Sequence, residues 1–252
     1  MPELLPSPAA IVSSALAQSW RAVRARLDAA CVAAGRSADD VQLLAVSKSV
    51  DTDAALALHE LGAHEFGENR VGELERKAAR FTELGREARW HFIGNLQRNK
   101  ARRVAQVADV VHSVSGPKLL ETLARVAAEE SRVLDVYLEV HLSGEDEKQG
   151  FAPDELDAAV RAARASSALR LLGLMTMAPR PAPGDTTGAA AGDAFAHCAE
   201  LARDLAAAHP GAFVDGRARL SMGMTGDLEQ AVAEGSTCVR IGSAIFAPGG
   251  SA

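Results

Sequence analysis

Short apolar runs alternate with longer amphipathic stretches along most of the chain. The apolar runs have the length of β-strands, and the amphipathic stretches have the spacing of helices that bury one face. Eight strands are predicted, at Gln42–Ser47, Ala63–Gly67, Trp90–Ile93, Asp109–His112, Val133–His141, Leu171–Leu174, Ala218–Ser221 and Thr237–Ile241. The intervals are long enough for right-handed crossovers, and several strands lack strict alternation. The strands should therefore be parallel and buried on both faces.

Helices are predicted between these strands, at Asp53–Leu61, Arg70–Leu84, Gln97–Gln106, Pro117–Glu130, Pro153–Ala165, Ala194–Ala208 and Asp227–Ala233. A further helix, at about Ile11–Ala34, comes first, and Gly35 would end it. Eight β/α units predict an α/β fold, a single TIM-type (β/α)8 barrel with an extra N-terminal helix. A doubly wound sheet would usually carry a Gly-rich fingerprint after its first strand, where this chain has a lysine.

One domain is expected over residues 1–252. Residues 1–40 would form an N-terminal helical extension. The low-complexity stretch Ala178–Asp193 would form a flexible loop between the sixth strand and its helix.

Composition narrows the class of protein. The chain is 48% hydrophobic, with a formal net charge of -6 and 4% aromatic residues. This balance argues against nucleic acid and membrane surfaces as partners. No apolar run approaches the roughly 20 residues that span a bilayer, and the first residues lack the pattern of a signal peptide. The three cysteines, Cys31, Cys198 and Cys238, are scattered, which favours a reducing cytoplasm.

Lys48 follows the first predicted strand, in "LLAVSK". Active sites of such barrels lie at the C-terminal ends of the strands. Leu44, Val46 and Lys48 share one face, and if it points inward, the amine enters the barrel mouth. A partly desolvated lysine is a nucleophile suited to an imine with an aldehyde or ketone. The alternative is a lysine whose ammonium reaches from the strand end to solvent, and this residue alone favours that alternative.

The loops after the seventh and eighth strands are typical of phosphate binding. The first, Ser221–Asp227, offers two glycines and two hydroxyls before a helix start, and backbone N–H groups of such a loop can hold an anion. In the second, Ile241–Phe246, Gly242 would let a ligand approach the backbone and Ser243 supplies a hydroxyl. Barrels often bind phosphate at these two loops, although two ordinary turns remain the alternative.

Arg240 lies inside the eighth predicted strand. It alternates with Val239 and Ile241, which should meet the outer helices, so its guanidinium should lie inside the barrel. A buried arginine needs a partner, either an inward carboxylate or a ligand acceptor. Glu68 and Asn69, after the second strand, are either helix-start residues or, for Asn69, a ligand contact, and the two interpretations have equal weight.

Two other polar features are interpreted as structural. Arg98, Lys100, Arg102 and Arg103 would form a solvated basic helix surface, and His91 would be a packed strand residue. No spacing of histidine, cysteine or carboxylate residues suggests a metal.

Together, a strand-end lysine, a phosphate site and an inward arginine fit a ligand with a carbonyl, a phosphate and an acceptor between them. Pyridoxal 5'-phosphate (PLP) has all three groups: its aldehyde would form the imine and its ring nitrogen would accept from Arg240. A sugar phosphate in a Schiff-base aldolase fits the first two.

The same stretches resemble a known family, the small single-domain PLP-binding proteins called the proline synthetase co-transcribed or PLP-homeostasis family. The resemblance runs from about Val41 to Phe246. It rests on the blocks "LLAVSK", "FGENRVGE", "WHFIGNLQRNK", "SGEDEKQGF", "LLGLMTM", "LSMGMTGDLEQAVAEGST" and "VRIGSAIF".

The resemblance implies a fold type III barrel like the N-terminal domain of alanine racemase. It implies that Lys48 is the cofactor lysine, that Ser221, Gly242 and Ser243 contact the phosphate, and that Arg240 faces the pyridine nitrogen. Members of the family generally show no convincing enzyme activity and are associated with control of free PLP. Apo PLP-dependent enzymes are therefore the candidate recipients of PLP.

The chain departs from the family pattern at a few positions. His141 stands where Asn is common, Thr225 where Ser is common, and Ala247 where Gly is common. The loop Ala178–Asp193 is longer than usual. Thr225 keeps the hydroxyl, whereas His141 could alter the barrel mouth.

Three functions remain: a PLP-homeostasis protein without a dedicated reaction, a PLP-dependent amino-acid racemase, and a Schiff-base sugar-phosphate aldolase. Racemisation needs two acid/base groups, and the only tyrosine, Tyr137, lies in the middle of a strand. Arg240 would also leave the ring a weak electron sink. The aldolase would lack a proton relay near Lys48 and leaves Arg240 unexplained. The first function is therefore favoured, in a protein that we expect to be monomeric.

Overall fold

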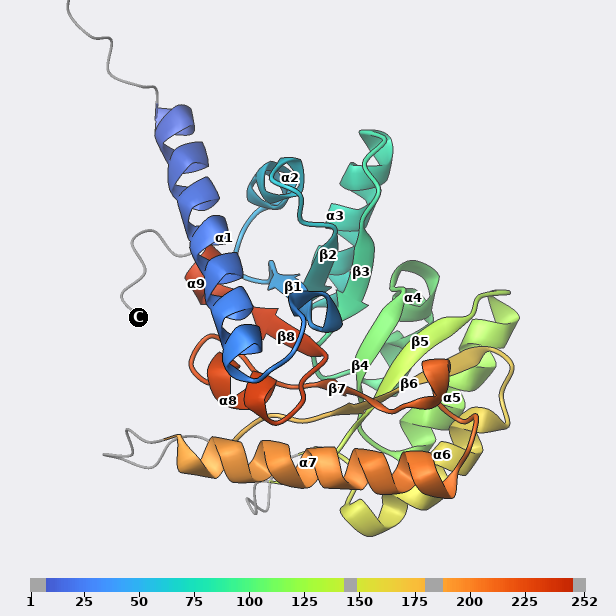
Figure 1. Ribbon diagram of the computed structural model, residues 1–252. Helices are drawn as coiled ribbons and strands as arrows, with labels where there is room; N and C mark the ends of the chain where they lie inside the picture. Colours follow the sequence, from blue (N-terminus) through green and yellow to red (C-terminus); the bar gives the residue numbers. More distant parts are fainter. Residues whose placement is uncertain (1–7, 143–148, 180–187, 247–252) are drawn as a thin grey trace, which may run out of the picture.

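Eight parallel strands close into a barrel in the order of the sequence, with β8 pairing back onto β1 (Figure 1). The computed structural model describes residues 8–142, 149–179 and 188–246. The strands are β1 (Gln42–Val46), β2 (Glu65–Glu68), β3 (Arg89–Phe92), β4 (Val110–Val114), β5 (Leu134–Glu139), β6 (Leu169–Met175), β7 (Arg219–Ser221) and β8 (Cys238–Ile241). The predicted TIM-type barrel is confirmed.

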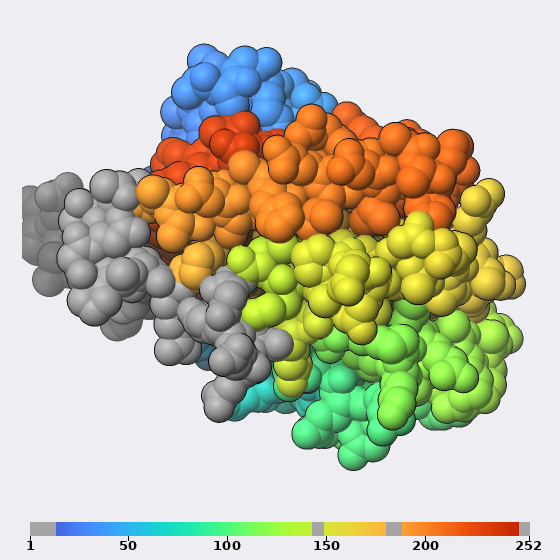
Figure 2. Space-filling view, turned by 90° about the horizontal axis from the view of Figure 1, so that it is seen from below, coloured from blue at the N-terminus to red at the C-terminus, as the bar shows by residue number. Residues whose placement is uncertain are grey.

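Helices follow the strands and form the outer layer. They are α1 (Pro8–Ala33), α2 (Thr52–Glu60), α3 (Val71–Glu83), α4 (Ala101–Val107), α5 (Pro117–Glu129), α6 (Leu156–Arg164), α7 (Ala189–Ala208), α8 (Leu228–Ala233) and α9 (Ser243–Phe246). Short 3-10 turns lie at Ala38–Asp40, Arg98–Lys100, Pro153–Glu155 and Val214–Gly216. Seen from below, α7 (orange) lies between α6 (yellow) and the α8 and α1 side (Figure 2). Across the described ranges, no helix combines the length and apolar composition needed to cross a membrane.

Alternation along the strands separates two apolar clusters. The larger fills the layer between sheet and helices and includes Val239 and Ile241. The smaller, made of Val110, Tyr137, Leu172 and Met175, lies apart from it. Residues on the other strand face, such as Arg240, therefore point into the barrel, as predicted from alternation.

The N-terminal helix α1 completes the outer ring beside β8. The helix that follows β8, α9, is only four residues long, and α1 packs against α2, α8 and α9 (Figure 1). The Trp20 indole donates to the carbonyl oxygen of Leu61 (3.1 Å), and the Arg26 guanidinium pairs with Glu229 (2.5 Å). The extra helix is thus part of the outer ring of helices around the barrel.

Some predicted boundaries are wrong. The helix after the sixth strand begins at Ala189, not Ala194, so the end of the predicted loop Ala178–Asp193 is helical; residues 180–187 of that loop lie outside the described residues. The fifth strand ends at Glu139 rather than His141, because Val140 pairs only as an isolated bridge with Phe151. Runs of alanine and single strand-end residues carry little local signal for a boundary.

Candidate functional site

The barrel brings the predicted ligand-binding residues to one edge. Each lies at or just beyond the C-terminal end of its strand: Lys48 after β1, Asn69 after β2, Ser221 at the end of β7, Arg240 in β8, and Gly242 and Ser243 after β8. Because the strands are parallel and the barrel is closed, these ends surround a single mouth. Residues 143–148, which hold most of "SGEDEKQGF", lie outside the described residues.

Lys48 occupies a turn directly after β1. Its side chain is exposed, whereas Leu44 and Val46 on the same strand face are buried. Leu44 pairs with Arg240 of β8, whose side chain points into the barrel, so this face of β1 lies inside. The amine therefore stands at the solvent end of the inner face of β1.

A buried ion pair lies behind Lys48, on the outer face of the sheet. The Lys77 ammonium of α3 bonds the Glu68 carboxylate (2.6 Å) and the carbonyl oxygen of Ser47 (2.7 Å). The Ser47 hydroxyl donates to the same Glu68 oxygen (2.6 Å). The carbonyl and the hydroxyl of Ser47, the residue before Lys48, are thus held by a fully buried ion pair.

Asn69 is not the start of a helix. The N-cap of α3 is Arg70, which makes no side-chain cap bond, and Glu68 is buried against Lys77. The helix-start interpretation of Glu68 and Asn69 is therefore wrong. Asn69 is half-buried. Its backbone lies so close to Gly94 that a side chain at position 94 would collide with the Asn69 backbone.

Arg240 is buried inside the barrel and is held mainly by backbone. Its Nη1 donates to the carbonyl (2.6 Å) and hydroxyl (2.8 Å) oxygens of Ser221, and its Nη2 donates to the carbonyl oxygen of Thr176 (3.0 Å). Within the described residues no carboxylate pairs with it and no acceptor binds its Nε. The structural ion pair considered from the sequence is absent there, which leaves an N–H group for a ligand.

Burial shifts the ionisation of the groups around Arg240. Loss of solvation lowers the pKa of Arg240 below its ordinary value, although a guanidinium stays charged at neutral pH. Burial raises the pKa of Glu139, at the end of β5, to about 7, and nearby Arg240 partly offsets this rise. The interior therefore holds one fixed positive charge beside a carboxyl group that titrates near neutrality.

The hydroxyl of Ser221 is already used within the protein. It accepts from Arg240 and lies 2.8 Å from Nδ1 of His112. A second pair of hydroxyls lies at the mouth: Ser243 donates to Thr225 across 3.2 Å, and both residues are exposed or half-buried. These two loops are the pair in which phosphate binding is predicted.

Two contacts fix these loops in place. Arg26 of α1 donates to the carbonyl oxygen of Thr225 (2.7 Å) and also pairs with Glu229 of α8. Gly242 packs against β1, where an added side-chain carbon would lie 3.0 Å from the carbonyl oxygen of Val46. Close packing against β1 is therefore a structural reason for glycine at position 242, in addition to the predicted close approach of a ligand.

The other polar features match their structural interpretation. Arg102 pairs with Glu129 and Glu130, and Arg103 pairs with Glu75 (2.5 Å), all at the surface. His91 is buried in the barrel. No group of three metal-ligating side chains occurs in the part of the chain that the structure describes.

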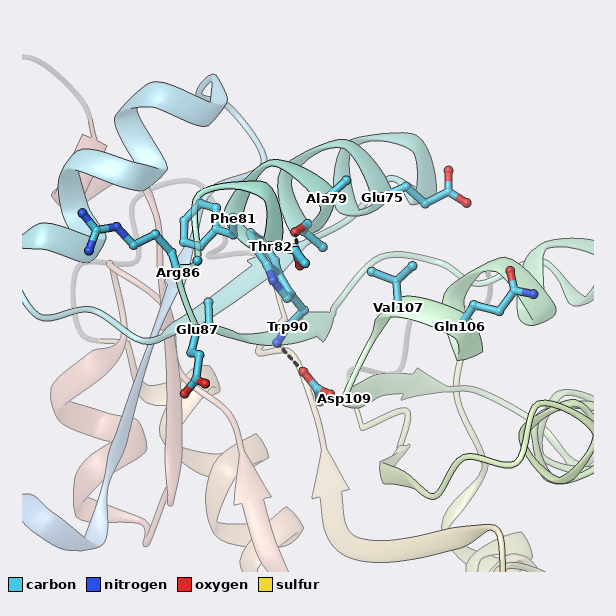
Figure 3. A pocket seen from close by; sticks show the side chains of 13 residues that line it. Glu75, Ala79, Phe81, Thr82, Arg86, Glu87, Trp90, Gln106, Val107 and Asp109 are labelled. Atoms are coloured by element: carbon cyan, nitrogen blue, oxygen red, sulfur yellow. Dashed lines mark hydrogen bonds between the residues drawn. The ribbon is translucent and has the colours of Figure 1, made fainter.

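A cavity of about 610 Å³ lies on the flank of the barrel, away from the mouth (Figure 3). Phe81 and Trp90 form part of its wall, and Glu75 and Glu87 are drawn at its edges. The backbone N–H of Trp90 donates to the carboxylate of Asp109 (2.9 Å), and both residues line the cavity. None of the predicted ligand-binding residues lines this cavity.

Comparison with known proteins agrees with the fold. The model of the alanine racemase N-terminal domain matches residues 13–248. The chain belongs to this family. A pyridoxal phosphate homeostasis protein of Pseudomonas aeruginosa is 40% identical over 233 residues, which cover 92% of this chain and 95% of that protein. The homeostasis protein of Escherichia coli K12 is 37% identical over 237 residues, with the same coverage.

Two solved structures are similar to this chain in fold. PipY of Synechococcus elongatus with PLP bound is 33% identical, with a TM-score of 0.79, and the match covers 92% of this chain and 99% of that one. Alanine racemase of Streptomyces lavendulae is 20% identical, with a TM-score of 0.64, and the match covers 57% of it. That second likeness concerns the fold alone.

Sequence reasoning missed several residues of the site. In the sequence, Lys77 is an ordinary polar position of a predicted helix, and only its burial in the structure reveals the ion pair. His112 and Glu139 lie in apolar strands, where alternation with Val110 and Tyr137 would have placed them inside the barrel.

Proposed function

We propose that the protein binds PLP at the barrel mouth and holds it reversibly, as part of PLP homeostasis, without a dedicated reaction. The observation that carries this proposal is Arg240, a buried guanidinium with a free N–H and no carboxylate partner among the described residues. It stands at the same mouth as the exposed Lys48. The homeostasis relatives and PLP-bound PipY support the proposal.

The residues present fit PLP. When bound, PLP supplies an aldehyde that a lysine amine can hold as a reversible imine. Lys48 offers the amine, Arg240 offers a donor for the ring nitrogen, and Thr225 and Ser243 offer hydroxyls for the phosphate. Ser221 acts through Arg240, since its hydroxyl is already bonded to that guanidinium.

Arg240 favours holding over catalysis. A guanidinium donates to the ring nitrogen but does not protonate it, so the ring remains a weak acceptor of electrons. A racemase also needs a second acid/base group across from the lysine. Tyr137, the only tyrosine, is buried inside the barrel, where it stacks on His112 at a ring separation of 4.7 Å. An aldolase would leave Arg240 without a role.

We further propose one domain for the whole chain, a monomeric state and a cytoplasmic location. Free, buried Cys31, Cys198 and Cys238 suit a reducing compartment. An accessible mouth suits transfer of PLP to apo enzymes that depend on it.

A transfer assay tests this function. The loaded protein is mixed with an apo PLP-dependent enzyme, and recovery of that enzyme's activity is compared with spontaneous release of PLP, measured by trapping free PLP. Recovery faster than release is expected. Recovery no faster than release would sink direct transfer, and amino-acid turnover that is lost in Lys48→Ala would overturn the non-catalytic role.

A further inference from the structure

A line of hydrogen bonds crosses the barrel interior and ends at Arg240. Glu65 of β2 lies 2.5 Å from Nε2 of His91 on β3. Nδ1 of His91 lies 2.8 Å from Nε2 of His112 on β4. Nδ1 of His112 then lies 2.8 Å from the Ser221 hydroxyl, which Arg240 also bonds at 2.8 Å. Five side chains from five strands thus form one continuous chain, which we call the interior relay.

The two ends of the interior relay fix its direction. Arg240 can only donate, and an ionised Glu65 can only accept. Ser221 accepts from Arg240, and because a neutral His91 that donates from Nε2 to Glu65 must accept at Nδ1, the Ser221 hydrogen points to Nδ1 of His112. His112 then donates from Nε2 to Nδ1 of His91, and His91 donates from Nε2 to Glu65. The reverse direction would leave the Nε2 of a neutral His91 and the Glu65 carboxylate facing each other as two acceptors.

Burial keeps both imidazoles neutral, as this arrangement requires. His91 and His112 are 1% and 0% exposed. Burial lowers the pKa of His91, although Glu65 opposes the shift, and it lowers the pKa of His112 well below its ordinary value, with further help from His91 and Arg240. Tyr137 stacks on His112 but takes no part in the relay.

The far end of the interior relay reaches the opposite face of the barrel. Glu65 is the first residue of β2, and its side chain is 27% exposed. It lines a cavity of about 620 Å³ together with Arg89, Asp135 and Arg170. Those three side chains are bound to one another, since Asp135 pairs with both arginines. The relay therefore joins a charged, open face to the guanidinium at the mouth.

We propose that His91 and His112 are positioning residues for Arg240. Their fixed tautomers keep the Ser221 hydroxyl as an acceptor toward Nη1, which holds the guanidinium against the backbone and leaves Nε for the ligand. This inference rests on the proposed function only for the identity of that ligand. The relay and its direction are properties of the chain alone.

Nitrogen-15 NMR of the imidazoles in the PLP-free protein tests the direction. Both rings should be the neutral Nε2–H tautomer at about pH 7 and above, because burial lowers the pKa of each. A charged ring at neutral pH, or an Nδ1–H tautomer in either ring, would overturn the inference. This readout does not depend on PLP, so a protein that never bound PLP would lose its proposed function and keep this result.

Replacement at the centre of the interior relay tests its effect on the site. His112→Phe keeps a ring beside Tyr137 but removes both hydrogen bonds, and we expect PLP to bind about tenfold more weakly, as is typical when a supporting hydrogen bond is lost. Tyr137→Phe is the matched control, since it keeps the ring that stacks on His112 and removes no hydrogen bond of the relay. The bound-PLP absorption band should also shift in His112→Phe and not in the control. Equal affinities and bands would contradict the positioning role.

Replacement of Glu65, at the exposed end of the interior relay, tests the same proposal if His112→Phe does not fold. Glu65→Leu removes the acceptor, whereas Glu65→Gln keeps an oxygen that can accept from His91. Glu65→Leu should weaken PLP binding and disturb the His91 tautomer, and Glu65→Gln should restore both. Identical behaviour of these two variants would overturn the proposal.

Discussion

The ammonium of Lys77 lies 2.7 Å from the carbonyl oxygen of Ser47, the residue immediately before Lys48. The same ammonium pairs with Glu68, and neither side chain is exposed to solvent. The backbone that carries the mouth lysine is therefore anchored from behind by α3. One oxygen of Glu68, Oε2, is buried with no hydrogen-bond partner among the residues that the structure describes, so the cluster has little tolerance for losing its cation.

Loss of this cation should be costly. Lys77→Met should lower the free energy of unfolding by about 3–5 kcal/mol, because Glu68 would be left as a buried, unpaired charge. Urea unfolding measures the change. The double variant Glu68→Gln/Lys77→Met should recover much of the loss, since it removes the charge as well.

Arg76→Met is the control for this cluster. Arg76 precedes Lys77 in α3, and its exposed side chain bonds Glu73 and the Thr52 hydroxyl, so its loss should destabilise the protein far less than the loss of Lys77. Equal costs for Lys77→Met and Arg76→Met would show that the buried pair does not anchor the strand.

The two hydroxyls at the mouth should contribute through the phosphate. Thr225→Val and Ser243→Ala should each weaken PLP binding by about tenfold, as expected for one lost hydrogen bond to a charged group. Binding of pyridoxal, which lacks the phosphate, should change little. Absorbance titration with both compounds measures the difference, and Thr82→Val on the exposed face of α3 is the control. Equal losses for PLP and pyridoxal would place the phosphate elsewhere.

Glu139 should make stability depend on pH. Its pKa is raised to about 7 in the folded protein, above the value of about 4.3 in an unfolded chain, so the folded state binds its proton more tightly. The associated stability is fully present below about pH 4 and is lost as the pH rises toward 7. A pKa difference of this size corresponds to roughly 3–4 kcal/mol, at about 1.4 kcal/mol per pKa unit.

Urea unfolding at pH 5 and pH 8 tests this assignment. The loss of stability between the two values should be smaller in Glu139→Gln than in the unchanged protein, because the amide does not titrate. A pH dependence that is the same in both proteins would assign the effect to another group.

The sequence predicted the barrel because its signals are local and repeated. Each strand is a short apolar run and each crossover a helix, so the order of elements alone limits the topology. The inward direction of Arg240 followed from its alternation with Val239 and Ile241. The start of α7 did not follow, because Ala189 and its neighbours suit a loop of small residues as well as a helix.

The supporting contacts of the site could not be predicted in the same way. The bond between His112 and Ser221 joins residues 109 positions apart across the barrel, and no sequence pattern reports such a distance. The phosphate contact of Ser221 stays a prediction, and the bond of its hydroxyl to Arg240 arises because both side chains point inward from neighbouring strands. No pattern in the sequence singles out Lys77, because a lysine on a helix is usually exposed.

The most direct test of the account is the location of bound PLP. The protein is mixed with PLP, the absorption spectrum is recorded, and the sample is reduced with borohydride and mapped by peptide mass. We predict an imine band and a phosphopyridoxyl mass on Lys48, both absent in Lys48→Ala and unchanged in Lys118→Ala. No band, or an adduct on another lysine with none on Lys48, would contradict the assignment of the barrel mouth as the PLP site.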